Sequence, residues 1–215
     1  TQEAIDPVRF ISNHSSGVQG LSLAEVAASA GAQVTLIAGP GVPESSASIE
    51  RHNVVSAADM HAAVHGRLEN IDLFIGVAAV ADYRVAEAAE QKIKKNPSNA
   101  EHLDLRLVEN PDIIASVAAS AHDVVVVGFA AETQDTLNHA RAKRQRKGLH
   151  AIIVNDVSDS SIGFNSPNNA TTFICDHAEV SFERQSKKDM ATKLLQQIAK
   201  TLGEQLTNGK PPHRS

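Results

Sequence analysis

The first candidate for chemistry along the chain is a polar loop at residues 12–20, with the sequence SNHSSGVQG. It combines small side chains and two glycines with an apolar stretch of helical spacing that follows directly. Backbone N–H groups at a helix N-terminus point outward and bind phosphate and other anions. The loop is therefore a candidate anion site, and His14 is the one histidine within it. An ordinary helix start, with Ser15 or Ser16 as the N-cap, explains the same residues equally well.

Two groups of cations could bind a polyphosphate. The first is the run KIKK at residues 92–95, and the second is Lys143, Arg144, Arg146 and Lys147, near the end of a predicted helix. Taken alone, the first is typical of a solvated basic patch, and the second complements the C-terminal end of a helix dipole. Lys143 and Lys147 are four residues apart and so share a helix face. Two such groups in a protein of net charge −5 favour a polyphosphate site, because cations neutralise charge that develops on the leaving group.

Four carboxylates near the expected ends of strands are candidates for holding Mg²⁺: Asp82, Asp112, Glu132 and Asp156. Magnesium prefers hard oxygen ligands of this kind. The four are spread along the chain without a dense metal-binding motif, and each is equally consistent with a helix cap or another structural role. The metal ligands therefore stay open.

The elements that must position these residues alternate between strand and helix. Residues 1–7 predict a polar loop, rather than the apolar strand that usually opens a nucleotide-binding α/β unit. Apolar periodicity predicts strands at residues 33–38, 73–78, 124–127 and 151–155, and helices at residues 21–30, 57–68, 111–121 and 133–147. The four valines at 124–127 are typical of a central parallel strand buried on both faces. Leu103, Leu105 and Leu107 alternate with polar residues and predict a half-buried strand.

This alternation predicts an α/β fold, with a Rossmann-like, mostly parallel sheet and helices on both faces. Residues 170–175 and 179–184 then predict a β-hairpin, followed by a closing helix at residues 187–202. We expect one domain over residues 1–203 and a disordered tail over residues 204–215. Ligands of such sheets bind outside the carboxyl ends of the strands. Residues that follow predicted strands should therefore meet at one edge: 79–83, 110–112, 129–133 and 155–156.

Composition limits the classes of function. The 215 residues are 42% hydrophobic and 21% charged, which suits a soluble globular domain with a sizeable core. The acidic net charge gives no reason to expect nucleic acid as a partner, and no apolar run approaches the roughly 18 residues of a membrane span. We expect no signal peptide, because no apolar segment of that kind is present near Thr1. Cys175 is the only cysteine, which excludes an intrachain disulfide and makes a cytoplasmic setting the default.

Two other functions compete with that of an enzyme that acts on a polyphosphate. An NAD(P)-dependent oxidoreductase usually has a carboxylate at the end of its second strand, but that strand ends Ala38-Gly39-Pro40. The tyrosine–lysine pair of short-chain dehydrogenases is also missing, because Tyr83 is followed four residues later by Glu87. The other competitor is a non-catalytic module that binds a nucleotide or dimerises. Binding of a nucleotide without turnover would select it.

Several ordered motifs resemble the phosphopantothenoylcysteine synthetase domain of bacterial coenzyme A biosynthesis bifunctional proteins. The resemblance covers residues 3–202, and its motifs are DPVRFISNHSSG at 6–17, AAVADY at 78–83, KIKK at 92–95, NPDI at 110–113, GFAAET at 128–133, NDV at 155–157 and GFNS at 163–166. It implies a two-step ligase. The carboxylate of 4'-phosphopantothenate attacks the α-phosphate of CTP and releases pyrophosphate. The amine of L-cysteine then attacks the acyl-cytidylate and releases CMP.

The resemblance also implies roles for single residues. Asn13 matches the position that contacts the acyl-cytidylate, and Lys92 matches the lysine needed to convert it to product. The substrate would lie against the loop formed by Asn13, His14, Ser15, Ser16 and Gly17. The nucleotide would lie against Gly76, Val77, Ala78, Asp82, Pro111, Asp112, Ile113 and Ile114, with Phe129 near the base and Lys92, Lys143 and Lys147 facing the phosphates.

Cofactors and partners follow from the same resemblance. Mg²⁺ would accompany CTP, and FMN would belong only to the decarboxylase half, which this chain lacks. The choice of CTP over ATP does not follow from the residues. Relatives form dimers, and the hairpin at residues 170–184 is the candidate contact. Relatives also carry a strand and a glycine-bearing turn just before the position of Thr1, so we expect this numbering to start inside a longer protein.

Overall fold

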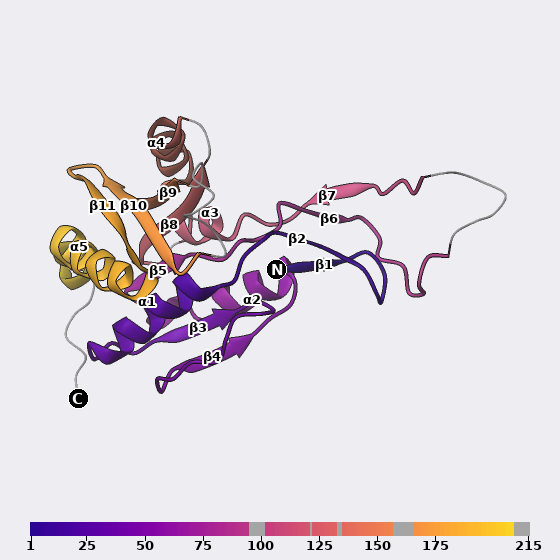
Figure 1. The fold of residues 1–215 in the computed structure, drawn as a ribbon, viewed down its shortest axis with the longest axis horizontal. Helices are drawn as coiled ribbons and strands as arrows, with labels where there is room; N and C mark the ends of the chain where they lie inside the picture. The colour runs from indigo at the N-terminus through magenta and orange to yellow at the C-terminus, as the bar shows by residue number, and fades with distance from the viewer. Residues whose placement is uncertain (95–101, 121, 133–134, 157–165, 209–215) are drawn as a thin grey trace.

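The computed structural model describes residues 1–94, 102–120, 122–132, 135–156 and 166–208. Within these ranges the chain forms an α/β body from which a long arm projects (Figure 1). The predicted fold class is confirmed, with a mostly parallel central sheet, helices on both faces and a C-terminal hairpin and helix. None of the helices in the described ranges is long and apolar enough to span a membrane.

A five-stranded sheet of order β11-β10-β9-β8-β5 forms the centre of the body. The strands are β5 Leu73–Gly76, β8 Val125–Glu132, β9 Ala151–Asp156, β10 Asn168–Cys175 and β11 Glu179–Ser186. β5, β8 and β9 run parallel, and the β10–β11 hairpin adds two antiparallel strands. The register pairs Gly76, the last residue of β5, with Gly128, and Glu132 with Asp156, so β8 and β9 end together and extend past the end of β5.

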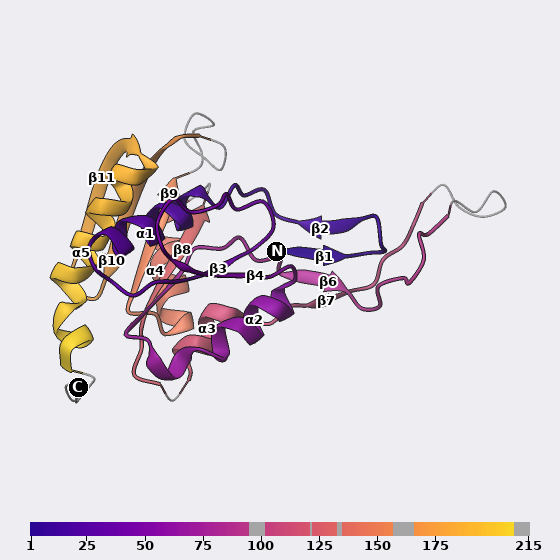
Figure 2. The same cartoon turned by 90° about the horizontal axis from the view of Figure 1, so that it is seen from below.

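Helices cover both faces of this sheet (Figure 2). α1 Val18–Ser29 and α5 Lys187–Asn208 pack on one face, and α2 Ala57–His65, α3 Ile113–Ala118 and α4 Thr136–Lys147 pack on the other. A short 3₁₀ helix, η1 Leu68–Asn70, follows α2. Side chains of β8 alternate between the two faces, as the two-residue period of a strand requires. Val127 packs toward α1 and α5, whereas Val126 packs toward α2, α3 and α4.

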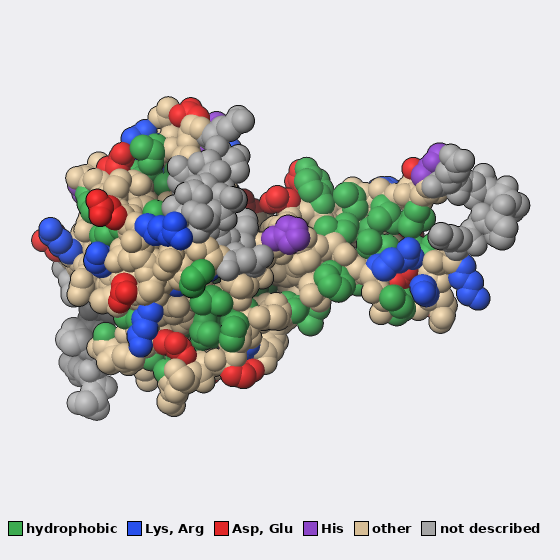
Figure 3. Space-filling model, in the orientation of Figure 1, with side chains coloured by type: hydrophobic (Ala, Val, Ile, Leu, Met, Phe, Trp, Pro, Cys, Tyr) green, Lys and Arg blue, Asp and Glu red, His purple; other side chains and the backbone are tan. Residues whose placement is uncertain are grey.

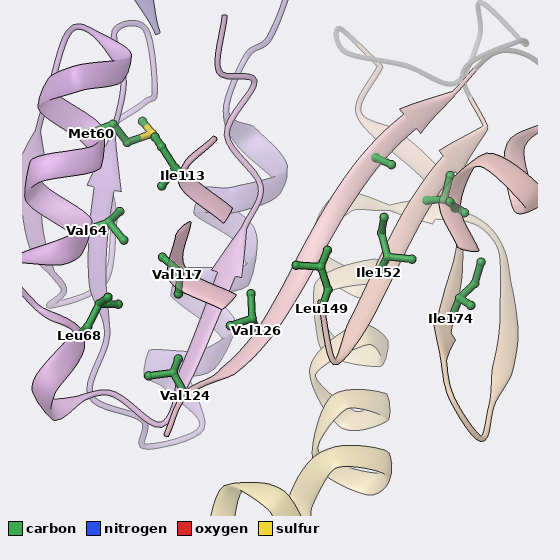
Figure 4. Close-up of a cluster of buried hydrophobic side chains, with 13 residues drawn as sticks. Met60, Val64, Leu68, Ile113, Val117, Val124, Val126, Leu149, Ile152 and Ile174 are labelled. Carbon is green, nitrogen blue, oxygen red and sulfur yellow. The ribbon is translucent and has the colours of Figure 1, made fainter. Parts of the chain in front are cut away.

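The core under α2, α3 and α4 is assembled from side chains at helical and strand spacing (Figure 4). Met60, Val64 and Leu68 face Ile113 and Val117 across the two helices. Complete burial of an aliphatic side chain contributes about 1.5–3 kcal/mol to folding. This core therefore fixes α3, and with it the segment that precedes α3, against the sheet.

Two further strands, β3 Thr35–Ala38 and β4 Glu50–Asn53, form a separate parallel pair beside the body. β4 leads into α2 through a capping box: Ser56 Oγ accepts the Asp59 N–H, and the Asp59 carboxylate accepts the Ser56 N–H. The buried carboxylate of Glu3 accepts the Ala57 N–H at 2.9 Å. The first strand of the chain is thereby tied to the start of α2.

The arm consists of residues 1–12 and 83–109, as far as they are described. It contains two antiparallel pairs, β1 Gln2–Ala4 with β2 Phe10–Ser12 and β6 Tyr83–Val85 with β7 Leu107–Glu109. Hydrophobic side chains gather along its surface (Figure 3). Leu103, Leu105 and Leu107 are 49%, 38% and 45% exposed. Of the predicted half-buried strand, Leu107 lies in β7, but the expected burial is wrong, because the described residues of the arm form no helix layer on which an apolar strand face could pack.

Several boundaries differ from the sequence expectation for local reasons. The expected loop at residues 1–7 contains the short strand β1, which pairs with β2. α3 begins only at Ile113, because the carboxylate of Asp112 accepts the Ala115 N–H at 3.2 Å and makes Asp112 the N-cap. At the other end of the chain, α5 continues to Asn208, so residues 204–208 are helical rather than part of a disordered tail. Residues 209–215 lie outside the described ranges.

Candidate active site

The turn after β5, residues 77–82, is where the predicted site residues converge. Gly76 ends β5, and Val77 and Ala78 lead from it into this turn. Asn13 donates from Nδ2 to the carbonyl oxygen of Val80 at 3.0 Å. The loop after β2 is therefore held against the turn that follows the carboxyl end of β5.

Asn110 ties the segment before α3 to the same turn. Its backbone N–H donates to the carbonyl oxygen of Asp82 at 2.8 Å, and its side-chain amide donates to the carbonyl oxygen of Ala81 at 2.8 Å. Pro111 and Asp112 follow immediately in the chain. Three segments that are far apart in sequence thus meet at one edge: the loop after β2, the turn after β5 and the start of α3.

The start of α1 has the geometry of an anion site. Gly17 is the N-cap, with φ at 67°, a left-handed conformation that glycine adopts without strain. No side chain caps this helix, so the alternative in which Ser15 or Ser16 is the N-cap is wrong. Ser15 Oγ instead accepts the Gly17 N–H at 3.3 Å. The side chains of Asn13, His14 and Ser15 are exposed beside the helix start, where a ligand can reach them.

Lys147 and Asp112 form the charged part of the site. Lys147 Nζ lies 2.7 Å from Asp112 Oδ2, which joins the end of α4 to the start of α3. Burial raises the pKa of Asp112. The hydrogen bonds from Lys147 and the Ala115 N–H, together with the positive charges of Lys147 and Lys143, lower it by more, so the pKa of Asp112 lies below its usual value. Asp112 is therefore ionised near neutral pH, beside the two lysines predicted to face phosphates.

Some predicted nucleotide contacts are packed into the fold. A Cβ at Gly76 would lie 3.0 Å from Ile114 Cδ1, and one at Gly128 would lie 2.9 Å from the same atom. Ile114 therefore rests directly on two glycines of adjacent strands, and these positions exclude a side chain. Ile113 is buried in the core under α2. Its contact with a ligand would have to come from the backbone.

Phe129 lies on a different side of the sheet from the Asp112–Lys147 pair. Its ring packs with the cluster under α1 and α5, whereas Asp112 and Lys147 belong to helices on the opposite face. The backbone of Phe129 lies between Gly128 and Ala130, within β8. A base bound on the α3 side would therefore meet this backbone and not the ring.

Lys92 is not brought to the other predicted residues. The next residue, Ile93, donates its N–H to Asp6 Oδ2 at 3.1 Å, and its carbonyl oxygen accepts from Arg9 Nη2 at 3.2 Å. Lys92 is exposed on the arm, beside the turn between β1 and β2. Asn13, Asp112 and Lys147 lie in or against the body. Within this chain, the two residues predicted to be catalytic are thus on different parts of the molecule.

The carboxylates proposed for Mg²⁺ have different surroundings. Asp82 is exposed at the start of the arm, and Asp112 is paired with Lys147. The side chains of Glu132 and Asp156 lie outside the described part of the structure. Among the described residues, no group of three or more histidine, cysteine, aspartate or glutamate side chains could hold a metal ion. Residue 157 of the NDV motif and residues 163–165 of the GFNS motif also fall outside the described ranges.

Asn110 is the site residue that sequence reasoning left without a role. It belongs to the NPDI motif, but its side chain is used to join two turns rather than to contact a ligand. An asparagine directly before a proline is a common turn signal. That signal marks a turn, but it does not reveal which distant carbonyl groups the amide will bind.

A Rossmann-like fold with a glycine-capped helix start and a Lys147–Asp112 pair close to the turn after β5 is typical of nucleotide-dependent enzymes. Residues 1–202 match the model of the DNA/pantothenate metabolism flavoprotein C-terminal domain family. The chain belongs to this family.

Comparison with known proteins agrees with this assignment. The chain is 45% identical over 199 residues to the coenzyme A biosynthesis bifunctional protein CoaBC of Escherichia coli, covering 92% of this chain and 49% of that protein. The chain spans about half the length of the curated relatives it matches. The crystal structure of a CoaBC C-terminal domain superposes with a TM-score of 0.77 at 32% identity, covering 95% of this chain and 93% of the other. A Cab2 mutant in complex with phosphopantothenate-cysteine shares the fold, with a TM-score of 0.70 at 16% identity and coverage of 96% and 86%.

Proposed function

We propose that this chain is a CTP-dependent phosphopantothenate–cysteine ligase of coenzyme A biosynthesis. The observation that carries the proposal is the convergence of the loop after β2, the turn after β5 and the Asp112–Lys147 pair at one edge of the sheet. The identity to CoaBC proteins supports the same assignment. The expected products are 4'-phosphopantothenoyl-cysteine, pyrophosphate and CMP.

The first step places a carboxylate oxygen of 4'-phosphopantothenate on the α-phosphorus of CTP. The bond from that phosphorus to the bridging oxygen breaks, and pyrophosphate leaves with the electron pair. Lys143 and Lys147 are suited to neutralise the charge that builds up on the leaving phosphates. Asp112 keeps Lys147 at the start of α3, where those phosphates are expected.

In the second step, the amine of cysteine attacks the acyl carbon, loses a proton, and expels CMP. Asn13 is suited to hold the acyl carbonyl. Its Nδ2 carries two hydrogens, and the hydrogen bond to Val80 uses one of them, so the second is available to a substrate oxygen. As a neutral donor, Asn13 does not compete with the lysines for phosphate.

Mg²⁺ belongs to this proposal as the counterion of CTP. Asp82 and Asp112 offer the oxygen ligands that Mg²⁺ takes, and both lie in the segments that Asn110 joins. FMN belongs to the decarboxylase half of the bifunctional relatives and is not expected on this chain. A cytoplasmic location and the absence of nucleic-acid partners are further parts of the proposal.

A homodimer accounts for the position of Lys92. If Lys92 acts on the acyl-cytidylate, the arm must deliver it to a site other than the one in its own body, and a second copy of the chain provides such a site. Large exposed hydrophobic side chains on the arm support a contact there: Val8, Phe10, Tyr83, Leu103, Leu105 and Leu107. No large exposed hydrophobic residue of the described ranges lies on the hairpin at residues 170–184, so the arm is the better candidate for the dimer contact.

Paired variants test these assignments. We expect Asn13→Ala and Lys92→Ala each to lower ligase turnover by about 100-fold or more, since each removes a group that acts on the reacting atoms. Near-normal turnover in both variants would contradict the placement. Refolding the two inactive variants together should restore activity, because each heterodimer regains one site with an intact Asn13 and a partner's Lys92. Failure of the mixture to recover would contradict delivery of Lys92 by the second copy.

A further inference from the structure

The loop between β3 and β4, residues 39–49, forms a wall against the predicted substrate loop. Val42 in this loop lies directly on Gly17, because a Cβ at Gly17 would come within 2.5 Å of Val42 Cγ2. Val42 therefore leaves no space for a side chain at position 17, and the two loops are packed together there. The position of Gly17, and therefore of the first N–H groups of α1, depends on where Val42 is held.

Arg51 holds Val42 from the side of β4. Its Nη2 donates to the carbonyl oxygen of Val42 at 2.8 Å, and its Nη1 donates to the carbonyl oxygen of Pro43 at 2.6 Å. Nε donates to Asn53 Oδ1 at 2.8 Å and fixes the plane of the guanidinium. The side chain of Arg51 is only 14% exposed. Hydrogen bonds from a charged donor are stronger than neutral ones, so this fork is a firm restraint on two consecutive carbonyl groups.

Glu25 holds the other end of the same loop from α1. Its Oε1 accepts the Ser46 N–H at 2.8 Å, the Ser46 hydroxyl at 2.9 Å and the Ser45 hydroxyl at 3.1 Å. These hydrogen bonds, led by the one from the Ser46 backbone, lower the pKa of Glu25. The loop is thus held by Arg51 at Val42 and Pro43 and by Glu25 at Ser45 and Ser46. Val42 rests on the helix start that is predicted to bind the substrate.

We propose that Arg51 is a positioning residue for the binding of 4'-phosphopantothenate. Arg51 fixes the carbonyl groups of Val42 and Pro43, Val42 fixes Gly17, and Gly17 sets the direction of the N–H groups that meet the anionic substrate. The inference rests on the proposed function. It predicts an effect on one substrate only, because neither Arg51 nor Val42 contacts the Asp112–Lys147 pair that is assigned to the nucleotide.

The test uses the Arg51→Ala and Val42→Ala variants, with the KM of each substrate measured separately. We expect both variants to raise the KM for 4'-phosphopantothenate about tenfold, since small misplacement of a binding group is costly, and to change the KM for CTP by less than about twofold. Arg51→Lys should recover part of the loss, because one ammonium can reach one of the two carbonyl groups. Calorimetric titration with 4'-phosphopantothenate alone should show the same order of affinities without any turnover.

Arg67→Ala is the matched control. Arg67 also donates to a backbone carbonyl, that of Ala63 at 2.9 Å, and to the ring of the neighbouring His52, but it does not contact the loop at residues 39–49. It should leave both KM values unchanged. An unchanged KM for 4'-phosphopantothenate in Arg51→Ala, or an equal rise for CTP, would overturn the inference. Absence of ligase activity in the unmodified chain would instead count against the proposed function, and the calorimetric titration would still test Arg51.

Discussion

The body and the arm are stabilised in different ways. Helices bury both faces of the central sheet, and residues such as Ile152, Phe173 and Leu194 are completely buried. The arm has paired strands but no covering layer, and its leucines are exposed. The body therefore holds the nucleotide side of the site through apolar burial, whereas the arm depends on polar contacts and on whatever covers it.

A single carboxylate organises the turn between β1 and β2 in the arm. Asp6 accepts the N–H groups of Val8 and Arg9, each at 2.9 Å, the Arg9 guanidinium, and the Ile93 N–H at 3.1 Å. It joins the turn between β1 and β2 to the segment that carries Lys92. The comparison teaches that the nucleotide side of the site and the segment that carries Lys92 are positioned by different forces, and each can be disturbed separately.

The largest effect should come from emptying the body's core. Phe173→Ala removes a completely buried ring from β10 and should lower the free energy of unfolding by about 3–5 kcal/mol. Urea denaturation followed by circular dichroism measures this change. A loss below about 1 kcal/mol, well under the range for a buried aromatic residue, would contradict the description of the body.

A smaller loss of stability is expected from a change at Gly128, where the side chain of Ile114 packs against glycine. In the Gly128→Ala variant the new Cβ would lie 2.8 Å from Leu149 Cδ1 and 2.9 Å from Ile114 Cδ1, so these side chains must shift at a cost of about 1–3 kcal/mol. Thermal unfolding reports the loss. Ala131→Gly serves as the control, because Ala131 is exposed in the same strand. Equal stability of Gly128→Ala and the unmodified protein would show that the contact is loose.

Acid should loosen the arm through the protonation of Asp6. The hydrogen bond from Arg9 holds the pKa of Asp6 far below its usual value. A lowered folded-state pKa adds stability above the unfolded value of about 3.9, and this stability is lost as the pH falls below it toward the folded-state pKa. Hydrogen exchange of residues 5–12 and 86–94, corrected for intrinsic rates, should therefore accelerate below about pH 4.

The Asp6→Asn variant supplies the control for this prediction. An asparagine does not titrate, so its arm should exchange faster at neutral pH and show no further change through the acid range. A variant that follows the same pH profile as the unmodified protein would assign the effect to another carboxylate.

The smallest effect on folding should come from the apolar surface of the arm. Leu105→Ala removes a side chain that is already 38% exposed, and the stability of the monomer should change by less than about 0.5 kcal/mol. The same variant should weaken self-association in sedimentation experiments if the arm is the dimer contact. Unchanged self-association would contradict the assignment of the arm as the dimer contact. A loss of stability as large as that of Phe173→Ala would mean that the arm is part of the core.

Most of the body could be predicted from the sequence, because its signals are local or periodic. The valine run before Gly128 predicted a strand buried on both faces, and Val125, Val126 and Val127 are all buried there. The closing helix was predicted from its apolar spacing and begins at Lys187 as expected. Burial on a sheet imposes these patterns directly.

The arm could not be predicted in this way. Alternation at Leu103, Leu105 and Leu107 indicates that one face of a strand is apolar, but it does not say what covers that face. The position of Lys92 depends on long-range contacts of Asp6, 87 residues away from Ile93. Asn110 and Asp112 belong to one of the motifs, and Lys147 belongs to the cationic end of a predicted helix. The contacts of Asn110 with the turn after β5 and of Asp112 with Lys147 emerge only when the helices pack.

The central claim is tested most directly by pyrophosphate release. The chain would be mixed with CTP, Mg²⁺ and 4'-phosphopantothenate, with and without L-cysteine, and the series repeated with ATP and with a chain that carries the relatives' preceding strand and glycine-bearing turn. Our account predicts release that requires 4'-phosphopantothenate, with CMP appearing only after cysteine is added. Binding of CTP without pyrophosphate release, in both forms of the chain, would contradict it and identify a nucleotide-binding module instead.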